Sequence, residues 1–332
     1  MNARSFFLKL TCFAVGTVGV YFVVFFALSS VSLGEVTLLD RLNIYSTRTK
    51  PGGHGQTLLR FREAESHSPL DILFVGSSHT YRGFDPRLFA EHKLAAFNLG
   101  THSQTPLNTY YLLKRYLGTL RPQLVVVECY PSVLTIDGYE CFQDLAINAP
   151  LSAELFEMAL ALKSPNAVKL LVDKYLHELR VPLTTYRQRP LKDEAYVPGG
   201  YCETFVARPR EGGEAAEERL QPLDMQLDYL EEIIELNKAH HAETLVVVHP
   251  LPADVLAKTV NYRAVSADIS ARVGKNGVEF VDFNDRLKLD PYDDFKDTHH
   301  LNADGVKKFN AALLDYLFEN VRYRNLLTGN RT

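Results

Sequence analysis

The sequence lacks the compositional features that mark several large classes of protein. It has no long Gly/Ser, Gln/Asn or Pro-rich tract, and 46% of its 332 residues are hydrophobic, which excludes a disordered or fibrous chain. It has no internal repeat of solenoid period, so its length suits one large or two small domains. The net charge is −4, the pI is ≈ 6.3, and the basic residues are scattered. No basic patch exists for a nucleic-acid partner, and that class of function is set aside.

Cysteine is also scarce. The four cysteines are Cys12, Cys129, Cys141 and Cys202, and their spacing is not that of a zinc site. The last three would lie in an exported part of the chain, where one disulfide is permitted and one thiol stays unpaired. The sequence leaves this pairing open, with structural or free thiols as the simplest interpretation. No metal and no other cofactor is expected.

One long apolar segment stands near the N-terminus. No charged residue occurs from Leu10 to Gly34, and at about 1.5 Å of rise per residue a helix of this length crosses a hydrocarbon core of about 30 Å. The alternative is a cleaved signal peptide, for which Ala27-Leu28-Ser29 is a weak cleavage site. We expect residues 1–34 to form an uncleaved signal-anchor that enters the membrane through residues 10–34.

Charges around this segment predict its orientation. Arg4 and Lys9 precede it, and Glu35 follows it, so the positive-inside rule leaves the N-terminus in the cytoplasm. The protein is then a single-pass protein of the cell membrane, with its main domain periplasmic or extracellular. Residues 35–69 mix charges and glycines with little periodicity, and are expected to be a stalk.

Beyond the stalk, short apolar runs rich in β-forming residues recur along the chain. They are unbroken rather than alternating, which predicts strands buried on both faces of a parallel sheet. The runs are residues 71–78, 95–100, 123–129, 243–250 and 278–283.

Helical patterns fill the gaps between these runs. Thr105 and Pro106 are a typical N-cap and first helical residue, and helical apolar spacing recurs over 223–234 and 306–317. The alternation predicts a three-layer α/β/α sandwich with a flavodoxin-like parallel sheet over residues 70–325. An insertion at about 131–222, with helices near 152–163 and 165–179, is expected to form either a lid or substrate wall, or a surface excursion.

Polar residues gather where the predicted strands end. In a parallel sheet, ligands bind outside the carboxyl ends of the strands. Gly76-Ser77-Ser78-His79 follows the first run, Asn98-Leu99-Gly100 follows the second, and Asp297-Thr298-His299-His300 precedes the last helix. A serine nucleophile needs a base to take its proton, and an imidazole base needs a carboxylate to orient it. The sequence supplies all three groups at this edge.

These segments resemble the SGNH/GDSL hydrolase superfamily. GSSHT at 76–80 is similar to the first block of that superfamily, NLG at 98–100 to the second, and DTHHLNADG at 297–305 to the last. The resemblance implies that Ser78 is the nucleophile, that His300 and Asp297 are its partners, and that the N–H groups of Ser78 and Gly100 form the oxyanion hole.

Two departures from the family pattern affect the expected site. Ser77 stands where the first block often has Asp, and the third block, usually Gly-x-Asn-Asp, is replaced by Glu128-Cys129-Tyr130-Pro131. The side-chain oxyanion donor is therefore missing at its usual place, and losing one such donor costs roughly 10²–10³ in turnover. Asn98, His79 and His102 are candidate replacements by position.

The candidates for substrate contacts at this edge are Arg82, Asn98, Glu128 and His79. Arg82 is expected either to pair with Glu128 or to bind an anionic or hydroxylated substrate, and Glu128 to bind substrate hydroxyls or pair with Arg82. His249 ends the fourth run and either lines the site or is structural. His299 is the rival base to His300 and is expected to face outward.

Three functions are compatible with these residues. The first is an envelope esterase or acyltransferase acting on acyl, chiefly acetyl, esters of an exported glycan or other envelope substrate, with an envelope acylation protein as partner. The second is a catalytically silent SGNH-like domain that binds glycan or scaffolds an assembly complex. The third is a metal-dependent hydrolase, which lacks ligand spacing beyond an adjacent pair; its histidines would be His79, His102, His249, His299 and His300.

Overall fold

The computed structural model contains one central parallel sheet of five strands. The structure describes residues 3–33, 36–38, 51–52, 54–66, 69–179, 182–188, 191–209 and 217–329. The sheet order is β4-β3-β5-β8-β9, which is the flavodoxin-like order 2-1-3-4-5. Every predicted apolar run supplies one strand: β3 (Ile72–Val75), β4 (Ala96–Asn98), β5 (Leu124–Glu128), β8 (Glu243–Val248) and β9 (Glu279–Asp282). The expected fold class is confirmed.

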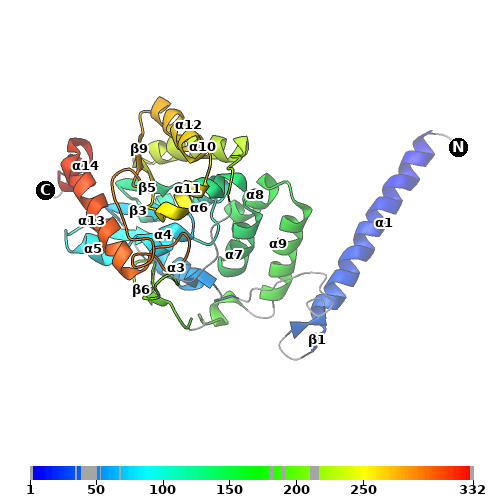
Figure 1. Ribbon diagram of the computed structural model, residues 1–332. Coiled ribbons are helices and arrows are strands. Elements are labelled where there is room, and N and C mark those ends of the chain that lie inside the picture. The colour runs from blue at the N-terminus through cyan, green and yellow to red at the C-terminus, as the bar shows by residue number, and fades with distance from the viewer. Residues whose placement is uncertain are drawn as a thin grey trace.

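Helices cover both faces of this sheet (Figure 1). Leu73 and Val75 of β3 face one hydrophobic cluster, while Ile72 and Phe74 face the other. Because side chains alternate along a strand, burial on both faces requires the unbroken apolar runs seen in the sequence. The first face is covered by α6 (Pro106–Leu120), α10 (Asp224–Ala239) and α12 (Tyr262–Lys275), and the second by α5 (Pro86–Ala90), α13 (Ala303–Glu319) and α14 (Val321–Thr328).

Capping residues set the helix boundaries that the sequence predicted. The Thr105 side chain accepts a hydrogen bond from the Asn108 N–H in a capping box, with Pro106 in the first turn. Asn302 caps α13 by accepting from the N–H groups of Asp304 and Gly305. The helix expected after residue 223 begins at Asp224.

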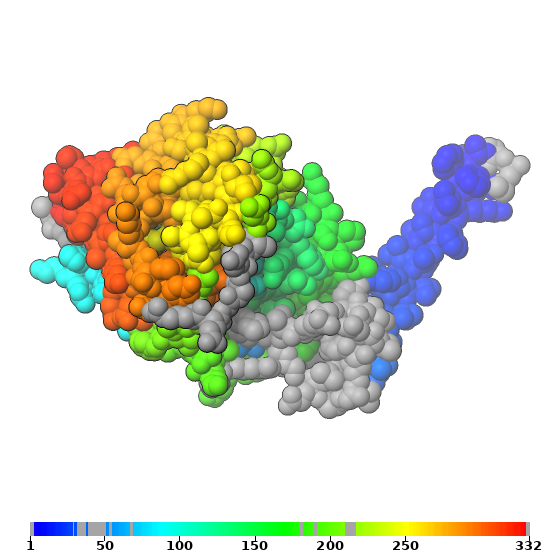
Figure 2. Space-filling model, viewed as in Figure 1, coloured from blue at the N-terminus to red at the C-terminus, as the bar shows by residue number. Residues whose placement is uncertain are grey.

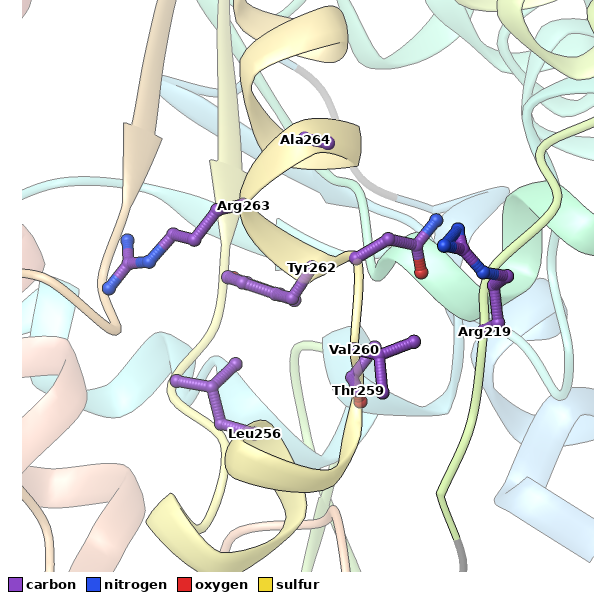
Figure 3. A pocket seen from close by; sticks show the side chains of 8 residues that line it. Arg219, Leu256, Thr259, Val260, Tyr262, Arg263 and Ala264 are labelled. Carbon is purple, nitrogen blue, oxygen red and sulfur yellow. The ribbon is translucent and has the colours of Figure 1, made fainter.

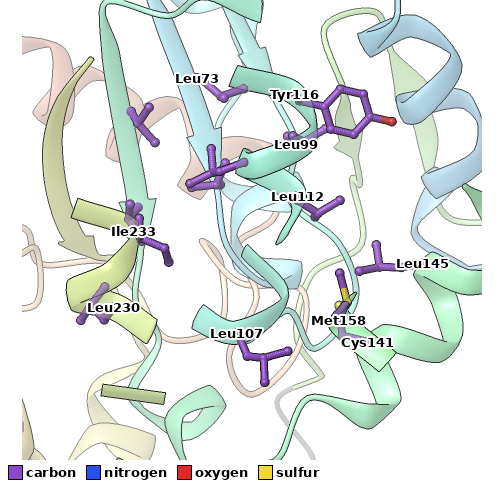
Figure 4. Packing of buried hydrophobic residues seen from close by; sticks show 14 of the residues in the cluster. Leu73, Leu99, Leu107, Leu112, Tyr116, Cys141, Leu145, Met158, Leu230 and Ile233 are labelled. Atoms are coloured by element: carbon purple, nitrogen blue, oxygen red, sulfur yellow. The ribbon is translucent and has the colours of Figure 1, made fainter. Parts of the chain in front are cut away.

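The insertion contributes to the core as well as to the surface. The two expected helices are α8 (Ala153–Ala161) and α9 (Pro165–Glu178), and α7 (Tyr139–Asn148), which was not expected, precedes them. Figure 4 shows Leu145 and Met158 of this segment packed near Leu107 and Leu112 of α6. At least the first half of the insertion is therefore bound to the sheet through α6, and is more than a surface excursion.

The second half of the insertion forms a small hairpin, β6 (Ala195–Val197) and β7 (Tyr201–Glu203). The sequence predicted irregular structure here. Asn98 donates its N–H to the Gly199 carbonyl at 2.8 Å, so the hairpin turn lies against the end of β4. Shorter elements are η2 (Pro131–Thr135), η3 (Leu183–Thr185) and α11 (Ala253–Lys258).

Part of the expected stalk is packed into the domain. Residues 54–64 form η1 (His54–Gln56) and α3 (Thr57–Ala64), in which Leu58 and Phe61 are buried. Arg60 is also buried and donates to the Gly200 carbonyl at 2.9 Å. This helix was not predicted from the sequence, because it is short and charged residues interrupt its apolar face. Most of residues 34–53 lies outside the described residues.

The N-terminal helix α1 (Ala3–Ser30) extends away from the domain (Figures 1 and 2). Its segment Ala3–Leu28 has a mean hydropathy of 2.1, so it is long and apolar enough to cross a membrane. A short pair, β1 (Ser32–Leu33) and β2 (Val36–Thr37), follows it. All four cysteines are free thiols, and three of them, Cys129, Cys141 and Cys202, are buried.

Candidate active site

The turn after β3 presents Ser78 at the carboxyl edge of the sheet. Gly76 has φ +139°, and a Cβ there would lie 2.6 Å from the Glu128 carbonyl oxygen, so only glycine fits. Ser77 then caps α4 (Ser78–Gly83) by accepting a hydrogen bond from the His79 N–H. Ser78 is consequently the first residue of α4, and its N–H has no carbonyl partner within that helix.

Ser78, His300 and Asp297 lie in one hydrogen-bonded chain. Ser78 Oγ is 2.7 Å from His300 Nε2, and His300 Nδ1 is 2.9 Å from Asp297 Oδ2. The other oxygen, Asp297 Oδ1, accepts the backbone N–H groups of His299 and His300 at 3.0 and 2.8 Å. One carboxylate therefore holds both the turn and the imidazole, which the spacing of three residues allows.

Burial controls the charge of this imidazole. It lowers the pKa of His300 to about 3, against the smaller opposing effect of Asp297. Burial alone would raise the pKa of Asp297, but hydrogen bonds from His300 and from the His299 N–H hold it below its usual value. His300 is thus neutral and Asp297 ionised at pH 7. With Nδ1–H donating to Asp297, Nε2 is free to accept the Ser78 proton.

The second expected oxyanion donor is occupied. The Gly100 N–H donates to Asn98 Oδ1 at 3.1 Å. A Cβ on Gly100 would lie 2.5 Å from that of Thr80, so glycine lets this loop approach α4 closely. The Gly100 N–H would have to turn away from Asn98 Oδ1 before it could reach an oxyanion.

Of the candidate replacement donors, Asn98 and His102 are engaged elsewhere. Asn98 is fully buried, and its amide donates to the carbonyls of Thr80 and Phe84 at 2.6 and 3.0 Å, which ties β4 to α4. His102 is exposed and pairs with Glu140 at 3.0 Å. His79 is the candidate that lies beside the base: its ring stacks 4.8 Å from that of His300.

A second hydrogen-bonded chain runs beside the first. Ser77 Oγ donates to Glu128 Oε2 at 3.1 Å, and Glu128 Oε1 lies 3.2 Å from His249 Nδ1. His249 Nε2 in turn lies 3.2 Å from the His299 carbonyl oxygen. We call Ser77, Glu128, His249 and the His299 carbonyl the support chain. Its ends are sequence neighbours of Ser78 and of His300.

The centre of the support chain is buried. The two ring nitrogens of His249 face oxygen acceptors, Glu128 Oε1 and the His299 carbonyl oxygen. The side chains of His249 and Glu128 have exposures of 1% and 0%. The expected alternative of a structural role for His249 agrees with these contacts.

The expected pairing of Arg82 with Glu128 is wrong. Arg82 forms its ion pair with Glu194, which also binds Lys296 at 3.0 Å. Glu128 is turned toward Ser77 and His249 and is not available, either to Arg82 or to substrate hydroxyls. Glu194 comes from the irregular part of the insertion, so no local signal in the sequence marked it as the partner.

Two further side chains complete the surroundings of the site. The Tyr130 ring lies 4.2 Å from that of His79 and is parallel to the ring of His299 at 6.3 Å. His299 is partly exposed, with a side-chain exposure of 37%, but its ring lies 4.0 Å from that of His300 and therefore beside the base, not turned outward as expected. Tyr130 stands in the altered third block, where only the absence of Asn drew attention in the sequence.

A surface pocket lies apart from these chains. It has a volume of about 440 Å³ and is lined by Arg219 and by residues of α11 and α12 and the loop between them, including Tyr262 (Figure 3). None of its lining residues belongs to the hydrogen-bonded chain of Ser78 or to the support chain. Its position gives no reason to assign the substrate to it.

Comparisons with known proteins found similarity in structure but not in sequence. No protein-family model and no curated protein matches this chain. A GDSL-like lipase from Bacteroides thetaiotaomicron is 13% identical with a TM-score of 0.41, covering 79% of this chain and 97% of its own. A family 3 carbohydrate esterase from Clostridium thermocellum is 15% identical with a TM-score of 0.38, covering 78% and 100%. An acetyl-xylooligosaccharide esterase from Geobacillus is 12% identical with a TM-score of 0.40, covering 75% and 94%.

Proposed function

We propose that this chain is an SGNH-type serine esterase or O-acyltransferase in which Ser78, His300 and Asp297 act as a catalytic triad. The observation that carries the proposal is the continuous contact from Ser78 Oγ through His300 to Asp297, at 2.7 and 2.9 Å. A nucleophile within hydrogen-bond distance of a neutral base, which is itself oriented by an ionised carboxylate, is the arrangement that acyl transfer requires.

The proposed reaction has two halves. Ser78 Oγ attacks the acyl carbonyl while His300 Nε2 takes the hydroxyl proton, and the alcohol then leaves with that proton. Water attacks the acyl-serine in the second half and His300 takes a proton from it. His300 then returns this proton to Ser78 Oγ as the acyl–oxygen bond breaks and the carboxylic acid is released. A sugar hydroxyl in place of water would give transfer instead of hydrolysis. Asp297 stays ionised and keeps Nδ1 protonated throughout.

The oxyanion would be held by backbone groups. The Ser78 N–H, at the start of α4, is the first donor, and the Gly100 N–H is the second once it leaves Asn98 Oδ1. No Asn side chain stands in the third block, so the proposed enzyme works with a smaller oxyanion hole. Turnover should be correspondingly modest.

We propose an acetyl ester of an exported glycan or another envelope molecule as the substrate. The support is the apolar helix α1, which would hold the domain at the membrane surface outside the cytoplasm, together with the family resemblance. Membrane-anchored members of the superfamily are associated with adding or removing such acetyl groups. An envelope acylation protein would then be the partner that supplies or receives the acyl chain.

A fluorophosphonate probe on the full chain in detergent tests this proposal, because it labels only an activated serine. We expect labelling of the parent and of His299→Ala, and none of Ser78→Ala or His300→Ala. Labelling that persists in Ser78→Ala would contradict the assignment of the nucleophile.

The occupied Gly100 N–H also supports a second candidate, a silent SGNH-like domain that binds glycan. Such a domain would keep the same fold without an activated serine. It predicts no probe labelling of the parent and no turnover of any small acetyl ester, together with measurable binding of an acetylated oligosaccharide.

A further inference from the structure

Four histidines from three separate segments come together at the site. The ring of His79 lies 3.9 Å from that of His249 and 5.3 Å from that of His299, and the rings of His299 and His300 are 4.0 Å apart. One of them, His249, has both ring nitrogens occupied in the support chain. The other three each carry a ring nitrogen toward a common point: these nitrogens lie within 4.8 Å of one another.

His79 holds an unused lone pair inside this cluster. Ser77 has one hydroxyl proton and gives it to Glu128, because a carboxylate only accepts. The contact of Ser77 Oγ with His79 Nδ1 at 2.9 Å must therefore use an Nδ1–H donor. That leaves Nε2 as the unprotonated nitrogen, and among the described residues it has no partner although His79 is only 3% exposed. A buried polar atom without a partner is costly, about 1–3 kcal/mol, and points to a missing ligand.

We propose that His79, His299 and His300 form a binding site for a divalent transition metal ion of the Zn²⁺ class. Neutral imidazole nitrogens are preferred ligands of Zn²⁺, and three histidines with one open position are a known ligand set. With Zn–N bonds of about 2.0–2.1 Å, the three nitrogens must approach to roughly 3.3 Å. His299, with 37% of its side chain exposed, is the ring with room to make this movement.

Metal binding here would oppose the chemistry proposed for the site. The lone pair of His300 Nε2 accepts the Ser78 hydroxyl at 2.7 Å, and it cannot do so while it binds a metal ion. The bound metal would thus remove the general base, and zinc should inhibit the enzyme. Binding itself does not depend on the proposed function; only the inhibition does. The direction in which zinc changes the rate distinguishes this site from a metal-dependent hydrolase, which zinc would activate.

Calorimetric titration of the full chain in detergent, first freed of metal with a chelator, tests the binding. We expect ZnCl₂ to bind at one saturable site and MgCl₂ not to bind, since Mg²⁺ prefers oxygen ligands. His299→Ala should weaken zinc binding by at least about tenfold, because even changes outside the ligand set cost about 10–100-fold. His240→Ala, at an exposed histidine of the α10 C-cap, is the matched control and should bind zinc like the parent.

Two further measurements test whether His300 binds the metal and whether metal binding inhibits the enzyme. Ser78→Ala should bind zinc at least as tightly as the parent, because no hydroxyl then competes for His300 Nε2. On a small acetyl ester, zinc should lower the rate of the parent and a chelator should restore it. The site is overturned if no saturable binding occurs, or if His299→Ala and His240→Ala bind zinc equally. If zinc binds at this site without slowing an active enzyme, His300 is not a ligand and the inhibitory role is overturned.

Discussion

Replacement of Glu128 should lower both the stability of the protein and its turnover. Its carboxylate accepts from Ser77 at 3.1 Å and faces His249 at 3.2 Å, with all three side chains buried. Glu128→Ala would leave two buried groups, the Ser77 hydroxyl and His249 Nδ1, without their partner. Each buried polar group left without a partner costs about 1–3 kcal/mol. We expect the free energy of unfolding to fall by about 2–6 kcal/mol.

The effect on turnover should be separable from this loss of stability. Glu128→Gln keeps the volume and one carbonyl acceptor for His249, so it should fold with a smaller loss of stability. The amide has one oxygen where the carboxylate has two, so Ser77 and His249 can no longer both keep their present bond to residue 128. The support chain then loses a contact, and a displacement of about 1 Å near the base costs up to about 10²-fold in rate.

Chemical denaturation and ester hydrolysis measure these two quantities on the same preparations. Glu235→Ala is the matched control, because Glu235 is 62% exposed and its nearest cation, on Lys238, is 4.0 Å away; the change should alter stability by less than about 0.5 kcal/mol. If Glu128→Ala is as stable as this control, the buried contacts of Glu128 with Ser77 and His249 do not stabilise the fold. If Glu128→Gln turns over like the parent, the support chain does not position His300.

Three other predictions concern the triad, pH and topology. Ser78→Ala and His300→Ala should each abolish nearly all activity, and the double variant should lose little more. Asp297→Asn should fold normally and slow the reaction by up to about 10⁴-fold. Additive losses in the double variant would refute a triad. Because burial lowers the pKa of His300 to about 3, the base should stay neutral and kcat/KM should stay level from pH 7 to about 5. The free energy of unfolding should fall below pH 6.5, since His300 binds a proton there in the unfolded chain but not in the folded one. A midpoint near 6.5 in the pH profile of kcat/KM would refute the burial effect. A reporter fused after Thr332 should be active outside the cytoplasm, and a cytoplasmic signal would reverse the proposed topology.

The parts of the fold that local patterns encode were predictable from the sequence. The five strands could be predicted because strands buried on both faces need unbroken apolar runs. The start of α6 could be predicted from Thr105 and Pro106. Helix α3 and the β6–β7 hairpin were missed, because they are stabilised by contacts with distant segments, such as that of Arg60 with the Gly200 carbonyl. The helix and strand propensities of a local segment do not indicate such contacts.

The candidate site divides in the same way. The pair Asp297 and His300 could be proposed from a spacing of three residues, which a single turn can close. Glu128 and His249 are 121 positions apart, and Arg82 and Glu194 are joined only through the insertion. Sequence reasoning therefore named Arg82, Glu128 and His249 at this edge of the sheet, but it missed Glu194 and could not say which groups pair.

The order of the strands explains why two hydrogen-bonded chains share one edge. β3, β5 and β8 are consecutive in the sheet, and adjacent strands lie about 4.8 Å apart, so Ser77, Glu128 and His249 at their ends are spaced for side-chain contact. β9 is next in the sheet, but Asp282 at its end accepts from Tyr262 and Ser266 instead. The support chain therefore leaves the sheet at His249 and reaches the His299 carbonyl. Because Ser77 and His299 are the sequence neighbours of Ser78 and His300, we expect a change within the support chain to alter the distance between the proposed nucleophile and its base.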